Sequence, residues 1–298
     1  MTSAGRFAPS PSGELHAGNL RTAILAWLFA RSTGRRFLLR VEDLDRARAG
    51  AEAEQLRDLA AVGVTWDGGV VRQTDRGPLY ADAIARLAAA GLTYECFCTR
   101  REIQEAPSAP HAPQGAYPGT CRDLSAAERE ARRTVRPAAV RLRSAVTEAS
   151  VQDVLHGSYT GVVDDFVLRR NDGVTAYNLA VVVDDAAQGI DQVVRGDDLL
   201  PSTPRQAYLA SLLNIPVPEY AHVPLILNAE GARLAKRDGA VTLTDLAAVG
   251  HSATEVRDAL LASLGLPGGP LVHALAVFDH AVLPREPWVW PGLGGPHA

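Results

Sequence analysis

Two short segments carry side chains suited to binding a nucleoside triphosphate. The segment "SGELHAGN" (12–19) has small residues that let the backbone approach a ligand, and His16 and Asn19 add side-chain donors before a predicted helix. The N-terminus of a helix presents free N–H groups and the positive end of its dipole, which favour an anion. The segment "RLAKRDGA" (233–240) holds Lys236, the only lysine in the chain. A histidine loop facing a lysine loop suits a triphosphate lying between them; the alternative is two ordinary surface loops.

The three cysteines form a second set of residues with possible chemistry. Cys96 and Cys98 lie in "CFC", and Cys121 follows "APSAPHAPQGAYPG" (106–119), which has four prolines and cannot be a regular element. An odd number of cysteines, two of them this close, does not fit a disulfide framework. In a cytoplasmic protein such a set favours metal ligation or plain burial.

The elements around the first segment predict an open α/β sheet. Apolar residues at positions 20, 23, 24, 27 and 28 have the spacing of one helix face, with Asn19 as the N-cap and Gly34 as the stop. "FLLRV" (37–41) predicts a buried strand, and Glu42 follows at its carboxyl end. Ligands of open α/β sheets bind at that edge.

The rest of the chain continues this pattern with one interruption. Residues 81–90 look helical and "LTYECF" (92–97) looks like a strand. The sequence pattern then changes over 96–163, which we interpret as an insertion. The pattern resumes with a hairpin turning on Asn-Asp-Gly in "DFVLRRNDGVTAY" (165–177). Further strands are expected at 192–196 and 222–227, a capping box at Ser252 and Glu255, and either strand or helix at "VVVDD" (181–185).

Composition and charge narrow the class of protein. A chain of 298 residues with 47% hydrophobic and 21% charged content fits a globular protein of about two domains. The longest apolar run, 23–30, is too short for a membrane span, and the N-terminus has no apolar signal region. We therefore expect a cytoplasmic protein with no membrane partner. The net charge of −4 restricts any contact with nucleic acid to a local surface.

Taken together, these segments resemble the class I aminoacyl-tRNA synthetases and, within them, the glutamate-activating branch. "RFAPSPSGELHAGNLRTAILAWLFARSTGRRFLLRVEDLDRAR" (6–48) is similar to the opening of that branch, with "HAGN" (16–19) in place of its HIGH signature. "RLAKR" (233–237) matches its KMSKS signature, with Ala235 where the family usually has serine. The resemblance runs from about residue 5 to residue 245.

The resemblance implies an ATP site. Its catalytic residues would be His16, Asn19 and Lys236, and its ATP-binding residues would be His16, Gly18, Asn19, Lys236 and Arg237. These groups would hold the phosphates or stabilise the transition state, and Mg²⁺ would shield the triphosphate. A lysine suits this role because a compact, mobile point charge can follow charge developing on the leaving pyrophosphate.

The resemblance also implies a pocket for L-glutamate. Arg6 and Arg195 match the carboxylate-binding arginines of the family, and bidentate pairing explains the residue type. Glu42 matches the residue that takes the α-amino group, and Val181 stands where full-length glutamyl enzymes tend to carry asparagine, which fits weaker glutamate affinity. The implied glutamate-binding residues are Arg6, Phe7, Ala8, Pro9, Ser10, Glu42, Tyr177 and Arg195.

In the insertion, the cysteines resemble three ligands of a structural zinc site. Cys96, Cys98 and Cys121 would bind through thiolates, with Tyr117 as the fourth ligand of the family. Thiolates suit Zn²⁺, and a small proline-rich insertion with little core gains from such a site. His111 is the chemically more ordinary fourth ligand, and three reduced, buried cysteines are the alternative.

The fold class that follows is α/β, a Rossmann-type open parallel sheet with a small inserted zinc-binding subdomain and a short C-terminal helical region. We expect the first half of the nucleotide-binding domain at 1–95, an inserted acceptor-type subdomain at 96–163, and the second half at 164–232. The lysine signature loop and a partial helical stem-contact region would occupy 233–298.

Chain length selects among the relatives. A chain that stops at residue 298 has no room for the large C-terminal helical anticodon-binding region of a full glutamyl enzyme, so the nearest resemblance is to a family of truncated paralogues. That family activates glutamate with ATP without tRNA and attaches it to the queuosine base in the anticodon loop of tRNA(Asp). The implied partners are ATP, L-glutamate and tRNA(Asp) carrying queuosine, and we expect a monomer.

Three other functions stay open. The first is a truncated synthetase that charges a tRNA 3′ end, and the second is a catalytically inactive relative that binds RNA or a partner. The third is a small adenylyltransferase acting on another carboxylic acid. Arg6 and Arg195 together with Glu42 favour an amino diacid over that last substrate class.

Overall fold

The main sheet of the protein has seven strands. In the computed structural model, which describes residues 3–45, 47–105, 117–234 and 241–292, their order is β3-β2-β1-β9-β10-β6-β7. All neighbouring strands are parallel except the β6–β7 hairpin. In the order of the sheet the strands are Val71–Arg72, Arg36–Val41, Ala4–Phe7, Ile190–Gly196, Glu219–Val223, Glu148–Asp153 and Gly157–Val162. The predicted open, mostly parallel α/β sheet is confirmed.

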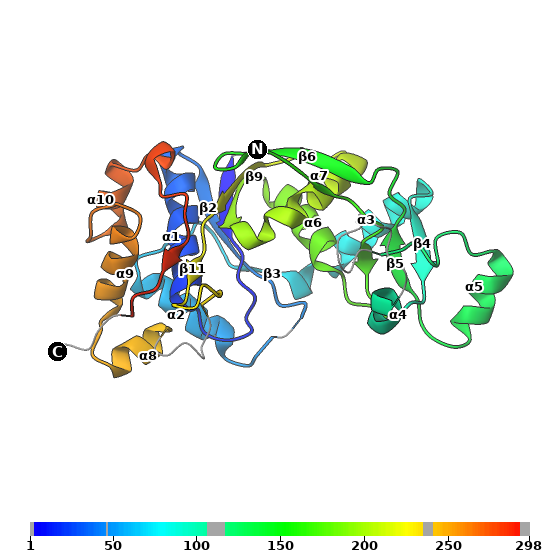
Figure 1. The fold of residues 1–298 in the computed structure, drawn as a ribbon, viewed down its shortest axis with the longest axis horizontal. Coiled ribbons are helices and arrows are strands. Elements are labelled where there is room, and N and C mark those ends of the chain that lie inside the picture. Colours follow the sequence, from blue (N-terminus) through cyan, green and yellow to red (C-terminus); the bar gives the residue numbers. More distant parts are fainter. Residues whose placement is uncertain (1–2, 46, 106–116, 235–240, 293–298) are drawn as a thin grey trace.

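One face of the sheet is covered by a helix that is itself buried. α1 (Ala17–Ser32) packs between the sheet and the C-terminal helices α9 (Ala253–Ala262) and α10 (Leu271–Ala276), as Figure 1 shows. Every residue from Ala23 to Ala30 is buried, which explains a long apolar run without a polar stripe. α2 (Ala51–Ala61) and α8 (Leu243–Ala248) complete this side. Among the described residues, no helix has the length and apolar character needed to cross a membrane.

The opposite face carries three helices, α3 (Gly77–Ala89), α6 (Tyr177–Gln188) and α7 (Thr203–Leu212). The segment 181–185, which fitted strand or helix, is the buried middle of α6. Burial on several sides removes the periodicity that would have identified a helix. α6 ends where Gly189 takes a left-handed conformation with φ 69°, which glycine adopts without steric cost.

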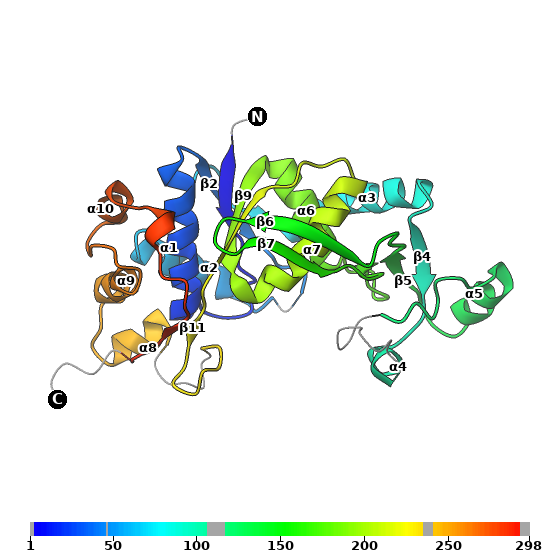
Figure 2. The ribbon, with the colours of Figure 1, turned by 45° about the horizontal axis from the view of Figure 1, so that its top comes forward.

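The chain between the two halves of the sheet forms a separate layer at one end of the molecule (Figures 1 and 2). Its antiparallel sheet has the order β4-β5-β8, built from Thr93–Cys96, Ala139–Leu142 and Val167–Arg169. α4 (Arg100–Glu105) and α5 (Ala126–Arg133) flank it. β6 and β7 leave this layer and extend the main sheet beside β10. The domain boundaries at 95/96, 163/164 and 232/233 stay predictions.

The remaining short elements lie at turns and near the C-terminus. They are η1 (Gln73–Arg76), η2 (Asp197–Ser202), β11 (Ile226–Leu227), η4 (His280–Val282) and β12 (Trp288–Val289). The strand expected over 222–227 is interrupted, because β10 ends at Val223 and β11 pairs instead with β12. Pro224 lies at the break and has no N–H to continue the ladder. The capping box at Ser252 and Glu255 is confirmed at the start of α9.

A fully buried arginine joins the two halves of the sheet. Arg40 on β2 donates from Nη1 to Asp185 Oδ1 at 2.8 Å and from Nη2 to Glu42 Oε1 at 3.3 Å. Its Nε lies 3.7 Å from Asp184 Oδ2. Both aspartates belong to α6, so the charge of one strand is balanced by a helix from the other half of the chain. Asp184 also pairs with Arg76 and Asp185 with Arg6, so three cations balance the three acids and removal of Arg40 would leave an excess of negative charge.

We expect Arg40→Met to lower the free energy of unfolding by about 3–5 kcal/mol, because two cations, Arg6 and Arg76, would then have to balance the carboxylates of Asp184, Asp185 and Glu42. Urea denaturation followed by circular dichroism measures this loss. Arg35→Met is the matched control, since Arg35 pairs with Asp191 at the surface and such pairs contribute at most about 1 kcal/mol. Equal losses in the two variants would contradict the importance given to Arg40.

Candidate active site and metal centre

α1 begins with a histidine cap at the edge of the sheet. The Nδ1 atom of His16 accepts from the backbone N–H of Gly18 at 3.1 Å and of Asn19 at 3.3 Å. In return, Asn19 Oδ1 accepts from the N–H of His16 at 3.2 Å. The prediction that Asn19 is the N-cap is therefore wrong: His16 is the N-cap and Asn19 is the third helical residue. An imidazole nitrogen can accept as a cap oxygen does, and this reciprocal pattern uses both side chains.

The cap fixes the protonation state of the His16 ring. Because Nδ1 accepts two N–H groups, the neutral ring carries its proton on Nε2, which is left as a donor. Burial, aided by the positive charge of Arg233, lowers the pKa of His16 to about 4, so the ring is neutral at pH 7. A Cβ at Gly18 would lie 3.0 Å from the ring, which explains glycine at this position. The helix start thus offers a neutral Nε2–H donor at the positive end of the helix dipole.

The lysine segment is anchored at both ends next to this helix start. Before it, the N–H of Leu234 donates to the carbonyl of Ile226 at 3.2 Å, and a Cβ at Gly18 would lie 3.8 Å from the Ile226 Cβ. After it, the carbonyl of Val241 accepts from the N–H of Ala17 at 2.8 Å. The described residues on either side of 235–240, Leu234 and Val241, therefore lie close to the first turn of α1. The predicted residues Ala235, Lys236 and Arg237 lie outside the described residues.

Arg6 and Glu42 lie at the carboxyl ends of β1 and β2, where the predicted glutamate pocket should be. Arg6 is 4% exposed and donates from Nε to Asp185 Oδ1 at 3.2 Å. Burial raises the pKa of Glu42, and the charges of Arg40 and Arg6 oppose that shift. Asp185 therefore orients Arg6. The positive charges of Arg40 and Arg6 balance the carboxylate of Glu42 when it is ionised.

Arg195 and Tyr177 meet at the same edge from the second half of the sheet. Arg195 Nη1 donates to the Tyr177 hydroxyl at 3.3 Å. Tyr177 is 39% exposed overall, yet burial of its hydroxyl end raises its pKa. The charges of Arg195 and Arg6 oppose this shift and that of Glu42 adds to it, so all three lie near one hydroxyl. The structure therefore gathers two cations, one anion and one hydroxyl from four separate elements.

The segment leaving β1 is held in place by backbone contacts. The N–H of Glu42 donates to the carbonyl of Pro9 at 2.9 Å, and Gln55 Nε2 donates to the carbonyl of Ser10 at 3.0 Å. Phe7 is buried in the core, whereas Ala8 and Pro9 are half-buried and Ser10 is exposed. Of these predicted contacts, only residues 8–10 are accessible to a ligand through their side chains.

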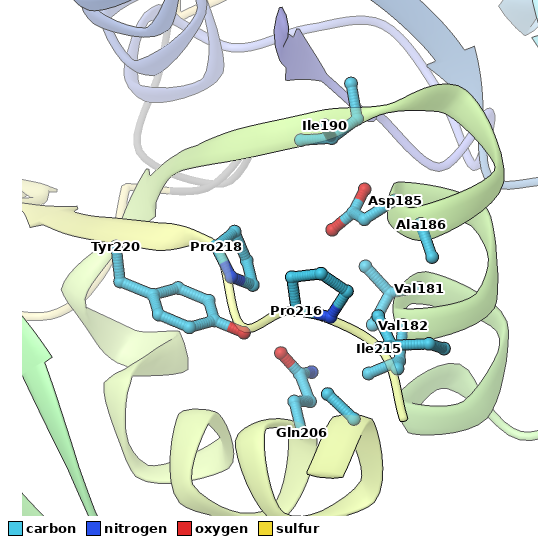
Figure 3. A pocket seen from close by; sticks show the side chains of 11 residues that line it. Val181, Val182, Asp185, Ala186, Ile190, Gln206, Ile215, Pro216, Pro218 and Tyr220 are labelled. Atoms are coloured by element: carbon cyan, nitrogen blue, oxygen red, sulfur yellow. The ribbon is translucent and has the colours of Figure 1, made fainter. Parts of the chain in front are cut away.

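A small cavity lies behind this edge, between α6, α7, β9 and β10 (Figure 3). Asp185, Gln206 and Tyr220 present polar groups to it, and Val181 and Pro216 contribute apolar walls. Val181 is 1% exposed, so the position where full-length glutamyl enzymes tend to carry an amide is apolar and closed here. The cavity adjoins the predicted glutamate pocket through Asp185, which accepts from Arg6.

The three cysteines converge as the sequence predicts. The sulfur atoms of Cys96, Cys98 and Cys121 all lie within 4.8 Å of one another and could hold a metal ion. The Tyr117 hydroxyl lies 3.3 Å from Cys96 Sγ and 3.7 Å from Cys98 Sγ, so an oxygen completes a set of four donors. The rival ligand His111 lies outside the described residues. A set of three thiolates and one oxygen around one point fits a tetrahedral ion such as Zn²⁺.

Several residues around the site were not anticipated from the sequence. Arg195 is also bonded to His222 and Thr203, and His222 to Asp153, which lies in the inserted region of the chain. The sequence gives His222 only as part of a strand. A hydrogen bond between residues 69 positions apart leaves no local pattern in the sequence.

Comparison with known proteins defines the class. The family described as "tRNA synthetases class I (E and Q), catalytic domain" matches residues 4–280. The chain belongs to this family of class I tRNA synthetases. It is therefore an aminoacyl-tRNA synthetase-type enzyme, a ligase, and the resemblance found in its sequence is confirmed.

Two relatives and one solved structure show which synthetases of this family the chain is similar to. The Glutamyl-Q tRNA(Asp) synthetase of Nocardia farcinica is 68% identical over 287 residues, which are 96% of this chain and 92% of the relative. The Glutamyl-Q tRNA(Asp) synthetase of Cutibacterium acnes is 53% identical over 95% of this chain and 82% of the relative. A glutamate tRNA ligase from Elizabethkingia meningosepticum, solved with its amino acid, superposes with a TM-score of 0.80 at 27% identity. It covers 97% of this chain, which spans only 66% of that longer protein.

Replacing the cap should separate its structural effect from its chemistry. We expect His16→Ala to lower the free energy of unfolding by about 0.5–2 kcal/mol, as loss of an N-cap does, and His16→Asn to lower it less. Urea denaturation at pH 7 measures both. Equal losses in His16→Ala and His16→Asn would contradict the capping role.

The lowered pKa of His16 leads us to expect that the stability of the protein depends on pH. The pKa of His16 is about 4 in the folded protein against 6.5 for a free histidine, so the unfolded chain binds more protons between these values. Acidification from pH 6.5 to 4 should therefore destabilise the wild type more than His16→Asn. Urea denaturation at pH 7 and pH 5 measures the difference. His222, whose pKa is also lowered, is present in both proteins and cancels.

Proposed function

We propose that this enzyme activates L-glutamate with ATP, without tRNA, and transfers it to the queuosine base of tRNA(Asp). The observation that carries the proposal is the meeting of Arg6, Arg195, Glu42 and Tyr177 at one edge of the sheet. Two guanidinium groups suit the two carboxylates of glutamate, and the Glu42 carboxylate suits its α-amino group. The names of the relatives, Glutamyl-Q tRNA(Asp) synthetase, support the acceptor.

The activation step needs positioning more than acid–base chemistry. An oxygen of the glutamate α-carboxylate attacks the α-phosphorus of ATP, a new O–P bond forms, and the bond to pyrophosphate breaks. His16 would donate from Nε2 to the phosphates, which would lie at the positive end of the α1 dipole. Lys236 would follow the charge on the leaving pyrophosphate, and Mg²⁺ bound to ATP would shield the triphosphate. The anchored ends of the lysine segment support this arrangement.

Transfer is the second half of the reaction. A hydroxyl of the queuosine cis-diol would take the glutamyl group from the adenylate, and AMP would leave. Val181 supports weaker glutamate binding than in full-length glutamyl enzymes, because its closed apolar side chain offers no hydrogen bond. ATP, glutamate and tRNA all occur in the cytoplasm, where we place the reaction.

We further propose that the cysteine cluster holds one structural Zn²⁺. Cys96, Cys98, Cys121 and Tyr117 would be its ligands, and the ion would fix the segment around Tyr117 against β4. Among the described residues, the small apolar cluster around these ligands has Tyr94 and Phe97 as its other buried members, which supports a need for such a crosslink.

Pyrophosphate exchange is the measurement that tests activation. We expect ATP–pyrophosphate exchange with glutamate alone among the amino acids, in the absence of tRNA. Lys236→Ala should lower the rate by about 100–1000-fold, the effect of removing one group that stabilises developing charge. Lys236→Arg should also be impaired, since a planar fork replaces a point charge. Arg170→Ala, an exposed arginine of the β8 hairpin, is the control and should exchange normally.

The acceptor is tested with labelled glutamate and purified tRNAs. We expect labelling of tRNA(Asp) that carries queuosine and none of tRNA(Asp) that lacks it. Exchange that requires tRNA(Glu), with labelling of its 3′ end, would replace the proposal by that of a shortened charging enzyme. No exchange with any amino acid would leave an RNA-binding relative without catalysis.

Metal content tests the zinc proposal independently of activity. We expect about one zinc per chain by mass spectrometry, and loss of it in Cys98→Ser and Cys121→Ser. Chelation should also lower the midpoint of thermal unfolding. Tyr117→Phe and His111→Ala separate the two candidates for the fourth ligand, because only the true ligand should weaken retention of the metal. Full retention in both cysteine variants would refute the site.

A further inference from the structure

The guanidinium of Arg195 is held along one edge by two buried groups that are not among the predicted pocket residues. Its Nε donates to His222 Nε2 at 3.0 Å, and its Nη2 donates to Thr203 Oγ1 at 2.9 Å. With the bond from Nη1 to Tyr177, three of its N–H groups have partners and two remain for a ligand. Arg195 is 5% exposed and His222 and Thr203 are fully buried, so water does not compete for these bonds.

His222 is held in turn by an acid from the inserted region of the chain. Its Nδ1 lies 2.6 Å from Asp153 Oδ2, and its backbone N–H donates to the same oxygen at 3.1 Å. The other oxygen, Oδ1, accepts the N–H groups of Leu155 and His156 at 2.9 and 3.0 Å. Asp153 is therefore an ionised acceptor on both oxygens, fixed by the turn that ends β6.

The register of the main sheet brings Arg195, His222 and Asp153 close together. Parallel pairing of β9 with β10 sets Arg195 beside His222, and pairing of β10 with β6 sets Tyr220 beside Asp153. Three neighbouring strands thus carry the cation, the imidazole and the acid across the sheet. The acid comes from the strand that the insertion adds to the main sheet.

We propose that Asp153 and His222 are positioning residues for Arg195, which present its remaining N–H groups to a carboxylate of the substrate. This inference rests on the proposed function, in which that substrate is glutamate. Asp153 holds the proton of the His222 ring on Nδ1, because a carboxylate can only accept it. Nε2 then has to be the acceptor that Arg195 Nε requires, since a guanidinium can only donate. Neither the bond to Asp153 nor the bond from Arg195 could form if the ring proton were on Nε2 instead of Nδ1.

A second proton on the ring would break this arrangement. An N–H at Nε2 would face the N–H of Arg195 across 3.0 Å, so protonation of His222 should displace the guanidinium. Burial, the largest effect, and the charge of Arg195 lower the pKa of His222 against the pull of Asp153. The titratable and charged groups around the ring are Asp153 and His156 from the β6–β7 hairpin, Arg195 from β9 and Tyr220 from β10. The hydrogen bond from Arg195 to His222 is therefore present at neutral pH and is lost as the pH falls.

Steady-state pyrophosphate exchange on four variants tests the proposal. We expect Asp153→Asn and His222→Phe to raise KM for glutamate by about 10–100-fold, as loss of an outer hydrogen-bond partner does at metal sites, with KM for ATP unchanged. His222→Gln should lie between these and the wild type, because its amide oxygen can still accept from Arg195. Asp165→Asn is the matched control: it removes another buried carboxylate, bonded to Arg122 in the inserted layer, and should leave both KM values unchanged.

The pH profile and the ring spectrum add readouts that a merely structural role would not move. We expect KM for glutamate in the wild type to rise as the pH falls, and this rise to be absent in His222→Gln. Nitrogen-15 NMR of the His222 ring should show the Nδ1–H tautomer in the wild type and its loss in Asp153→Asn. Circular dichroism and thermal unfolding establish that each variant is folded.

Each outcome of these experiments either supports or overturns the positioning role of Asp153 and His222. Folded variants with unchanged KM for glutamate would overturn the proposal, as would equal rises in the KM for ATP or a matching effect of Asp165→Asn. An Nε2–H tautomer in the wild type would also overturn it. Absence of glutamate exchange in the wild type would instead refute the proposed function. The ring spectrum, which needs no substrate, would then still decide whether Asp153 and His222 hold Arg195 as described.

Discussion

The buried charge of Arg40 has to be neutralised inside the sheet, and most of the site follows from how this is done. Arg40 lies in β2, and its partners Asp184 and Asp185 lie in α6, far along the chain. Because unpaired buried charges cost several kcal/mol, α6 is confined to one position against the first half of the sheet. Asp185 then orients Arg6, and the first residue of α6, Tyr177, is brought to Arg195. One requirement of charge balance thus sets the geometry of a pocket assembled from both halves.

The proposed nucleotide side of the site depends on a different principle, the termination of a helix. α1 is buried along its length, so its direction is fixed by the core, and its N-terminus opens at the carboxyl edge of the strands. His16 caps that end through Nδ1 and keeps Nε2 for a ligand. The backbone bond from Ala17 to Val241 brings the end of the lysine segment to the same turn. Stability of the helix end and its chemistry therefore use the two nitrogens of one ring.

The inserted region contributes to the site as well as to its own layer. Its cysteines and Tyr117 form a compact donor set at the far end of the molecule, while its hairpin returns to the main sheet and carries Asp153. Asp165, just after this region, bonds Tyr94, Arg122 and Ser144 and links parts of the small antiparallel layer. The candidate metal site and Asp153, which holds His222 behind Arg195, are thus parts of one continuous stretch of chain.

The sequence by itself determined the features that depend on local pattern. Most strands and helices outside the inserted region and the two signature segments depend on residue types at short spacings. The pairing of Arg6 and Arg195 with Glu42, and Tyr117 as a ligand beside the cysteines, came from the family resemblance. Tertiary structure alone decided the rest. It made His16 rather than Asn19 the cap, because the choice depends on how the chain enters the helix, and it made 181–185 a helix, because burial on all sides removes periodicity. The partners of Arg40 and the Asp153–His222–Arg195 chain join residues that are close only once strands pair, and such contacts leave no trace in local sequence.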